Sequence, residues 1–279
     1  MINRRTHQLV VLAVTGLAVI FSATMLWAGP IFLTGHDPDF HAQSSAGARN
    51  LLNAGLDFVT TGTYDSGVDK FLWVESRIAP PGGHLVGENG LAAIGLTLGT
   101  HYDRANAADF LSVDLSAYSA IAIASSFGGL LTRAELDALI ARDDDIAAFI
   151  NSGGGLLALS ECFPCGANLL TGSTAPDLYG YLPIEVSSIS ASPPFTITAF
   201  GASLGLGNGD INDPTHNSFG LIGGLNPVDL DTSDQATTLA GNVRIEDGEI
   251  KSVPEPATII LLSSGFGLLV AAGARRRKE

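Results

Sequence analysis

The sequence predicts an α/β domain in which helices pack on a parallel sheet. Short apolar runs alternate with helical stretches from Pro30 onward, an order typical of parallel strands joined by right-handed crossovers. The clearest unit is a helix that begins at a capping box, Thr132 with Glu135, and ends at three glycines, 153–155, before a buried strand. Two long apolar runs at the ends of the chain lie outside this domain.

The elements of the domain follow from the spacing of apolar residues and the turn signals between them. Strands are expected at 30–34, 71–75, 120–124 and 156–159. Helices are expected at 45–59, 88–98 and 132–150. The pattern is less regular after residue 182, with a strand expected at 195–200, a flexible Gly-rich loop at 201–209 and a polar stalk at 246–253.

The first apolar run, Leu9–Ala28, has the regions of a secretory signal. Arg4 and Arg5 precede it, and Ala28 offers a small residue for cleavage before Gly29. Leu26 is larger than the residue usually found near such a cut, so the exact cleavage site stays open and an uncleaved anchor is the alternative. We therefore expect residues 1–28 to be a signal peptide that directs the chain to the Sec translocon.

The second apolar run, Ala257–Ala274, is followed at once by a basic cluster, Arg275–Lys278. At 1.5 Å per residue its 18 residues span about 27 Å, just enough to cross the hydrocarbon core of a bilayer. Basic flanks tend to stay in the cytoplasm, and here they lie at the two extreme ends of the chain. We expect a C-terminal transmembrane helix, with both ends inside and the domain outside.

The charge of the domain limits its partners. Residues 29–253 carry 8 basic and 26 acidic residues, a net charge of about −18. Such a surface repels nucleic acid and anionic lipid. Cations, neutral glycans and other proteins are the expected partner classes.

The only two cysteines, Cys162 and Cys165, are separated by two residues. In an oxidising exported compartment they predict a local disulfide, with free or redox-active thiols as the alternative. A zinc site is disfavoured because no second pair of ligands lies nearby.

The tail contains the tripeptide Pro254-Glu255-Pro256, then the apolar run, then the basic end. These three parts, in this order at the very terminus, resemble the PEP-CTERM sorting signal over 254–279. The resemblance implies that an exosortase recognises the tripeptide, cuts near it and passes the body from the inner membrane to the surface or extracellular matrix of a Gram-negative-type bacterium that makes exopolysaccharide. A plain anchor with a Pro-rich stalk is the alternative reading.

Several segments of the body resemble class I glutamine-amidotransferase-like domains, including the ThuA-like branch. They are Thr34–Asp37, Ala148–Cys162, Asp213–Asn217 and Gly223–Leu225. The resemblance would cover about 29–245 as one domain, and it implies a flavodoxin-like parallel sheet with flanking helices.

Matching Gly153-Gly154 to the glycine pair of that family puts Ser160 at the position of its cysteine nucleophile. Ala158 and Cys162 then stand where the strained turn of a nucleophile elbow needs glycine. His216 is the matching candidate base, but Ser218 replaces the glutamate expected two residues later. These departures predict a domain without catalysis.

The densest group of ligand-type side chains follows the first strand, where His36, Asp37, Asp39 and His41 stand within six residues. At the carboxyl edge of the sheet, two imidazoles and two carboxylates could hold a divalent ion. The alternative is that the aspartates cap a turn and the histidines are solvated. No other cofactor is expected.

The sequence as a whole favours an exported binding protein of the cell surface or matrix. The alternative is a secreted hydrolase or amidase that acts on envelope or glycan material through Ser160 or through a metal held by His36 and His41.

Overall fold

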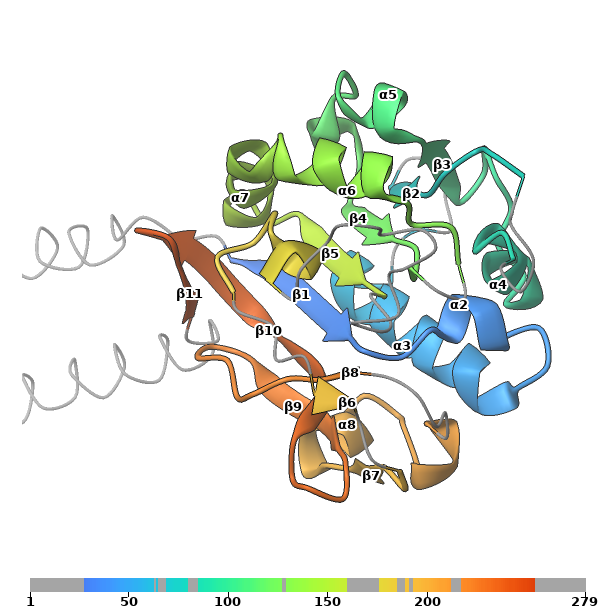
Figure 1. Ribbon diagram of the computed structural model, residues 1–279, viewed down its shortest axis with the longest axis vertical. Helices are drawn as coiled ribbons and strands as arrows, with labels where there is room; N and C mark the ends of the chain where they lie inside the picture. Colours follow the sequence, from blue (N-terminus) through green and yellow to red (C-terminus); the bar gives the residue numbers. More distant parts are fainter. Residues whose placement is uncertain are drawn as a thin grey trace, which may run out of the picture.

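A computed structural model describes residues 28–62, 64, 69–79, 85–126, 129–159, 176–184, 189–190, 193–211 and 217–253. Figure 1 shows one large twisted sheet with helices on both faces. This is the mixed α/β architecture that the sequence predicts.

The parallel half of the sheet contains the four predicted strands and one more. In spatial order its strands are β3 (Tyr102–Ala105), β2 (Phe71–Val74), β4 (Ala120–Ile123), β5 (Gly155–Ala158) and β1 (Gly29–Thr34). Each pairs in parallel with its neighbour. The apolar runs therefore predicted β1, β2, β4 and β5 to within a residue or two, β3 was not predicted, and the parallel pairing is confirmed.

An antiparallel half continues the sheet beyond β1, and of this half the sequence predicted only one strand, at 195–200. β10 (Ala236–Glu246) pairs with β1, then β9 (Asn226–Leu230) and the short β7 (Thr196–Ile197) follow. β6 (Ile189–Ser190) and β8 (Asn217–Ser218) form a separate two-stranded sheet.

The segment expected as a polar stalk, 246–253, is largely paired. β11 (Glu249–Ser252) forms a hairpin with the end of β10. The turn is Asp247-Gly248, with φ of 54° and 72°, and Asp-Gly is a strong signal for a tight hairpin turn that needs positive φ at both positions. The prediction of a stalk was wrong because it rested on the polarity of the segment and did not take the Asp-Gly turn into account.

The helices depart from the prediction mainly at their ends. α3 (Ala46–Thr60) begins at the Ser45 cap as expected, and α4 (Glu88–Ala93) stops before Gly95, where φ is 86°. The long helix predicted at 132–150 is two helices, α6 (Arg133–Ile140), which has the predicted capping box, and α7 (Asp143–Asn151).

Three short helices were not predicted: α2 (Pro38–His41), α5 (Ala107–Phe110) and α8 (Ala199–Ser203). α8 replaces part of the strand and loop expected at 195–209. Its start is fixed by Thr198, whose hydroxyl accepts a bond from the backbone N–H of Gly201 at 3.1 Å. Single-turn 3-10 helices occur at Leu115–Ala117, Pro176–Tyr179 and Asn208–Asp210.

Two hydrophobic layers lie on opposite faces of the sheet because side chains alternate along each strand. In β1, Phe32 packs on one face with Leu52 and Leu56 of α3. Ile31 and Leu33 pack on the other face, where α6 and α7 cover the sheet. All these side chains are buried, so the domain has a three-layer core.

The start of β5 lies directly against the end of α3. A Cβ added at Gly155 would lie 2.0 Å from the carbonyl oxygen of Val59, and backbone cannot move aside as a flexible side chain can. We expect Gly155→Ala to lower the free energy of unfolding by about 1–3 kcal/mol, the usual cost of overpacking. Chemical denaturation checks this, with Gly220→Ala as control because a Cβ there meets nothing within 4 Å. Equal midpoints for the two variants would contradict the close approach.

The domain begins and ends at the same edge of the sheet. Gly29, the first residue of β1, pairs with Val243, and Val243 also pairs with Ser252, the last residue of β11. Two strand spacings, about 10 Å, therefore separate the two ends of the domain. This edge is the amino edge of the parallel strands.

Candidate functional site

The opposite, carboxyl edge of the parallel strands carries the polar side chains that the sequence singles out. Residues 35–41 follow β1, 75–79 follow β2 and 124–126 follow β4. Because these strands are parallel and adjacent or nearly so, the three segments meet at one edge, which is where α/β sheets bind ligands.

His36 is held away from this edge, on the side of the antiparallel strands. Its Nε2 lies 3.2 Å from Oδ2 of Asp229, a residue of β9, and its ring meets Phe195 edge to face with centroids 4.8 Å apart. Both His36 and Asp229 are buried. The pair ties the loop after β1 to the antiparallel half of the sheet.

Asp37 and His41 interact one helical turn apart, with His41 Nε2 3.4 Å from Asp37 Oδ1. Asp37 is buried, whereas 37% of the His41 side chain is exposed. This contact spans α2 and fixes the tight turn that leads out of β1.

Asp39 reaches in the other direction, toward the centre of the parallel sheet. It is fully buried, and its Oδ2 accepts a hydrogen bond from the backbone N–H of Ser125, just after β4, at 3.0 Å. The Ser125 hydroxyl in turn accepts from the N–H of Gly129 at 2.7 Å. Asp39 thus joins the segments that follow β1 and β4.

The four predicted metal ligands therefore take part in three separate contacts. His36 faces Asp229, Asp37 faces His41, and Asp39 faces Ser125. Within the described ranges, no three His, Cys, Asp or Glu side chains are grouped so that they could hold a metal ion.

A carboxylate that the sequence reading missed, Glu75, lies beside Asp39. It follows β2 and is fully buried. Its Oε2 accepts hydrogen bonds from the indole N–H of Trp73 at 2.8 Å and from the backbone N–H of Glu88 at 3.1 Å. The signal in the sequence was an acidic residue directly after an apolar strand, Phe71–Val74.

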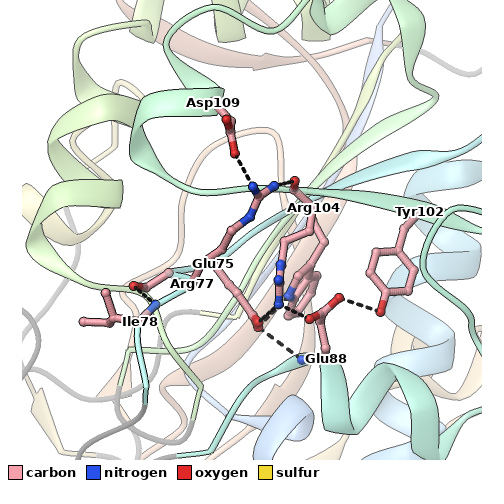
Figure 2. Close-up of polar contacts among 9 residues, drawn as sticks. Glu75, Arg77, Ile78, Glu88, Tyr102, Arg104 and Asp109 are labelled. Atoms are coloured by element: carbon pink, nitrogen blue, oxygen red, sulfur yellow. Dashed lines mark hydrogen bonds and ion pairs between the residues drawn. The ribbon is translucent and has the colours of Figure 1, made fainter.

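Arg104, from β3, neutralises this cluster in part. Figure 2 shows its guanidinium between Glu75, at 3.4 Å from Oε1, and Glu88, with which it forms a closer ion pair. The Tyr102 hydroxyl donates to Glu88 at 2.9 Å. The guanidinium of Arg104 therefore forms ion pairs with two carboxylates, those of Glu75 and Glu88. The buried carboxylate of Asp39 lies nearby and adds a third acidic group.

Burial raises the pKa of Glu75 from its ordinary value near 4.5 to about 7. The hydrogen bond from Trp73 opposes this effect, whereas the negative charges of Glu88 and Asp39 add to it. A carboxyl group with such a pKa exchanges its proton near neutral pH.

Two glycines make room for Asp39 and Glu75. A Cβ at Gly87 would lie 2.7 Å from Asp39 Oδ2 and 3.0 Å from Glu75 Oε2, and one at Gly129 would lie 2.4 Å from Asp39 Oδ2. Both carboxylates therefore converge on the backbone of Gly87. We call Asp39, Glu75, Glu88 and Arg104 the acidic cluster.

The predicted elbow is described only in part. Gly153 has φ of 100° and precedes β5, and Ala158 is the buried last residue of that strand. The other residues of this hypothesis lie outside the described residues: Ser160, Cys162, Cys165 and His216. Ser218, close to the last of these, donates to Asp231 Oδ2 at 3.0 Å.

Comparison with known proteins identifies the tail. Residues 252–278 match the model of the PEP-CTERM protein-sorting motif, and this supports the resemblance based on the tripeptide, the apolar run and the basic end. The motif indicates an exported protein that is processed by an exosortase on its way through the membrane to the cell surface. No curated protein and no solved structure matches the chain.

None of the helices in the described ranges is long and apolar enough to cross a bilayer. The runs expected to do so, 9–28 and 257–274, fall outside those ranges except for Ala28, as does the tripeptide 254–256.

Proposed function

We propose that the chain is a surface or matrix-associated binding protein that an exosortase releases from the inner membrane and whose domain presents a ligand site at the carboxyl edge of the sheet. The match of residues 252–278 to the sorting motif carries this proposal. Extracellular polysaccharide around a Gram-negative-type cell is the setting in which such a protein would act.

The geometry of the domain supports this arrangement. The sorting motif directly follows β11, at the amino edge, where β1 also begins. The acidic cluster lies at the other end of the strands, about 20 Å away for a strand of six residues. A tail that enters the membrane just after β11 would leave the acidic cluster at the end of the strands farther from the bilayer.

The amidotransferase-like identity of the domain is part of the proposal. The alternation of helices and parallel strands along the chain from β1 to β5 supports it, as do the glycines before β5. The strand order does not, because β1 lies between β5 and β10 and not between β2 and β3, as the first strand does in the flavodoxin-like order. Ala158, which stands where the elbow needs glycine, supports the loss of catalysis. The ligand site would then reuse the catalytic edge of the fold for binding.

One observation favours the alternative, a secreted hydrolase or amidase. Glu75 has a pKa of about 7 and lies beside Asp39, and two carboxyl groups in different environments are typical of acid–base catalysis. Arg104 already pairs with Glu75 and Glu88, and ion pairs of this kind also occur in purely structural clusters. We therefore prefer a binding function to a catalytic one.

We expect the protein to hydrolyse neither glutamine nor simple esters. A serine hydroxyl at position 160 needs an aligned base, and the elbow around it departs from the family pattern at Ala158 and Cys162. The test incubates the released surface form with glutamine, nitrophenyl esters and a covalent serine probe, with and without zinc or calcium.

Two variants separate the possible failures of this prediction. Turnover abolished by Ser160→Ala would overturn the binding-protein proposal in favour of a serine hydrolase. Metal-dependent turnover abolished by His36→Ala would favour a metal-dependent enzyme. A Ser112→Ala variant, changed at an exposed serine after α5, is the control for nonspecific loss.

A further inference from the structure

An open cleft of about 320 Å³ lies at the amino edge of the sheet, at the opposite end of the strands from the acidic cluster. Its walls are the last residues of α3 and α7 and the residues just before β4. Six hydroxyl-bearing side chains line it: Thr60, Thr61, Ser116, Tyr118, Ser119 and Ser152. The volume is at the low end of the range for small-molecule sites, about 300–1,000 Å³.

Five of these six hydroxyl groups donate their protons within the protein. Three of them donate to backbone carbonyl oxygens: Thr60 to Leu56 at 2.7 Å, Ser119 to Asp69 at 2.9 Å and Ser152 to Phe149 at 2.7 Å. The other two donate to carboxylates: Ser116 to Asp114 Oδ1 at 2.7 Å and Tyr118 to Asp103 Oδ2 at 3.4 Å. A hydroxyl whose proton is engaged in this way offers only its lone pairs. These five hydroxyls are therefore hydrogen-bond acceptors, and a ligand must supply the donors to them.

The charge around the cleft disfavours an anion. No acidic or basic side chain lines it. The carboxyl ends of α3 and α7 both reach it, and helix carboxyl ends carry partial negative charge. An ammonium group would find no carboxylate in the wall itself, and the carboxylates of Asp103 and Asp114, which adjoin the wall, already accept hydrogen bonds from Tyr118 and Ser116.

Two aromatic residues, Tyr118 and Phe149, add apolar surface to this wall of acceptors. Tyr118 packs against the hydrophobic core and is half-buried, whereas Phe149 is buried. A ligand that matches such a wall has hydroxyl groups, which donate to the acceptors, and an apolar face, which packs on the aromatic side chains. A neutral sugar ring has this form.

We infer that this cleft binds a neutral saccharide through its hydroxyl groups. The inference is independent of the acidic cluster and of the sorting motif, because none of their residues lines the cleft. It adds a second site, at the edge of the domain where the chain enters and leaves the sheet.

The test uses the full chain, purified in a detergent without a sugar headgroup, and saturation-transfer NMR. The probes are neutral tetrasaccharides (cellotetraose, maltotetraose and N-acetylated chitotetraose), an acidic one (tetragalacturonate) and a cationic one (the deacetylated glucosamine tetramer). We expect at least one neutral probe to bind with Kd of about 1 mM or tighter and the charged probes to bind at least about tenfold more weakly.

Two matched variants locate the site. Ser152→Trp places a large ring at the exposed end of α7, and it should weaken binding at least about tenfold by filling the cleft. Ser112→Trp is the control, since Ser112 is also exposed and also donates to the carbonyl three residues earlier, but lies outside the cleft. Both variants must keep the thermal unfolding midpoint of the parent chain, and Tyr118→Leu, which removes an aromatic face, supplies a second test if Ser152→Trp does not fold.

Three results would overturn the inference. One is that no neutral probe binds at millimolar concentration. Another is that the charged probes bind as well as the neutral ones. The third is that Ser152→Trp and Tyr118→Leu bind as the parent does, which would place the sugar elsewhere on the domain.

Discussion

Glu75→Gln is expected to stabilise the protein at pH 8 relative to the parent chain and to have little effect near pH 4. The side-chain amide mimics the protonated carboxyl group. Its oxygen can accept the same bonds from Trp73 and from the backbone N–H of Glu88 that Glu75 Oε2 accepts. The substitution keeps these two bonds and removes both the titration and the ion pair with Arg104.

The sign follows from the raised pKa. Glu75 titrates at about 7 in the folded chain and near 4.5 in the unfolded one, so the folded state holds the proton more tightly. Stability from this group is fully present below pH 4.5 and is lost as the pH rises to 7, by about 3 kcal/mol at most. The Gln variant should avoid this loss.

The measurement is the free energy of unfolding from pH 4 to 8, taken as the difference between variant and parent so that the other carboxyl groups cancel. Glu249→Gln, on the exposed strand β11, corrects for the removal of one charge. A difference between Glu75→Gln and the parent that is flat across this range would show that Glu75 is not held in the environment described above.

Replacing Pro254-Glu255-Pro256 by three alanines is expected to stop surface delivery almost completely. Proline restricts the backbone and has no N–H donor, so we expect a helix of the apolar run not to continue into the tripeptide. Alanine allows a continuous helix and removes the recognised side chains. The variant should accumulate in the inner membrane with its tail intact.

Fractionation followed by immunoblotting measures this effect. The control exchanges Ser263 and Ser264 for alanine, because these residues lie within the apolar run and their loss leaves both the tripeptide and the basic end unchanged. Normal surface levels of the triple-alanine variant would show that the tripeptide does not direct sorting.

The parallel half of the fold could be read from the sequence because each of its central strands is a short apolar run buried on both faces, as Phe71–Val74 and Ala120–Ile123 are. The antiparallel half gave no such signal. β10 is built from Thr, Ala, Gly and Asn as well as apolar residues, and β9 contains Pro227 and Asp229. These strands form because β1 offers them an edge, and that edge depends on the tertiary structure.

The candidate site was only partly predictable for a similar reason. The sequence placed His36, Asp37, Asp39 and His41 correctly after the first strand, but the direction of each side chain depends on distant partners, Asp229 in β9 and Ser125 after β4. Glu75 stood in a predicted strand as a single acidic residue. That Glu75 lies beside Asp39 could be predicted only with knowledge of the strand order, and the spacing of apolar residues does not reveal that order.

The intact mass of the surface form from the native host tests the central proposal most directly. If the sorting motif directs exosortase processing, the mature protein is lighter than the chain cut only at its N-terminus, by the mass of the apolar run and the basic end. A surface form that still carries Arg275–Lys278 would contradict it.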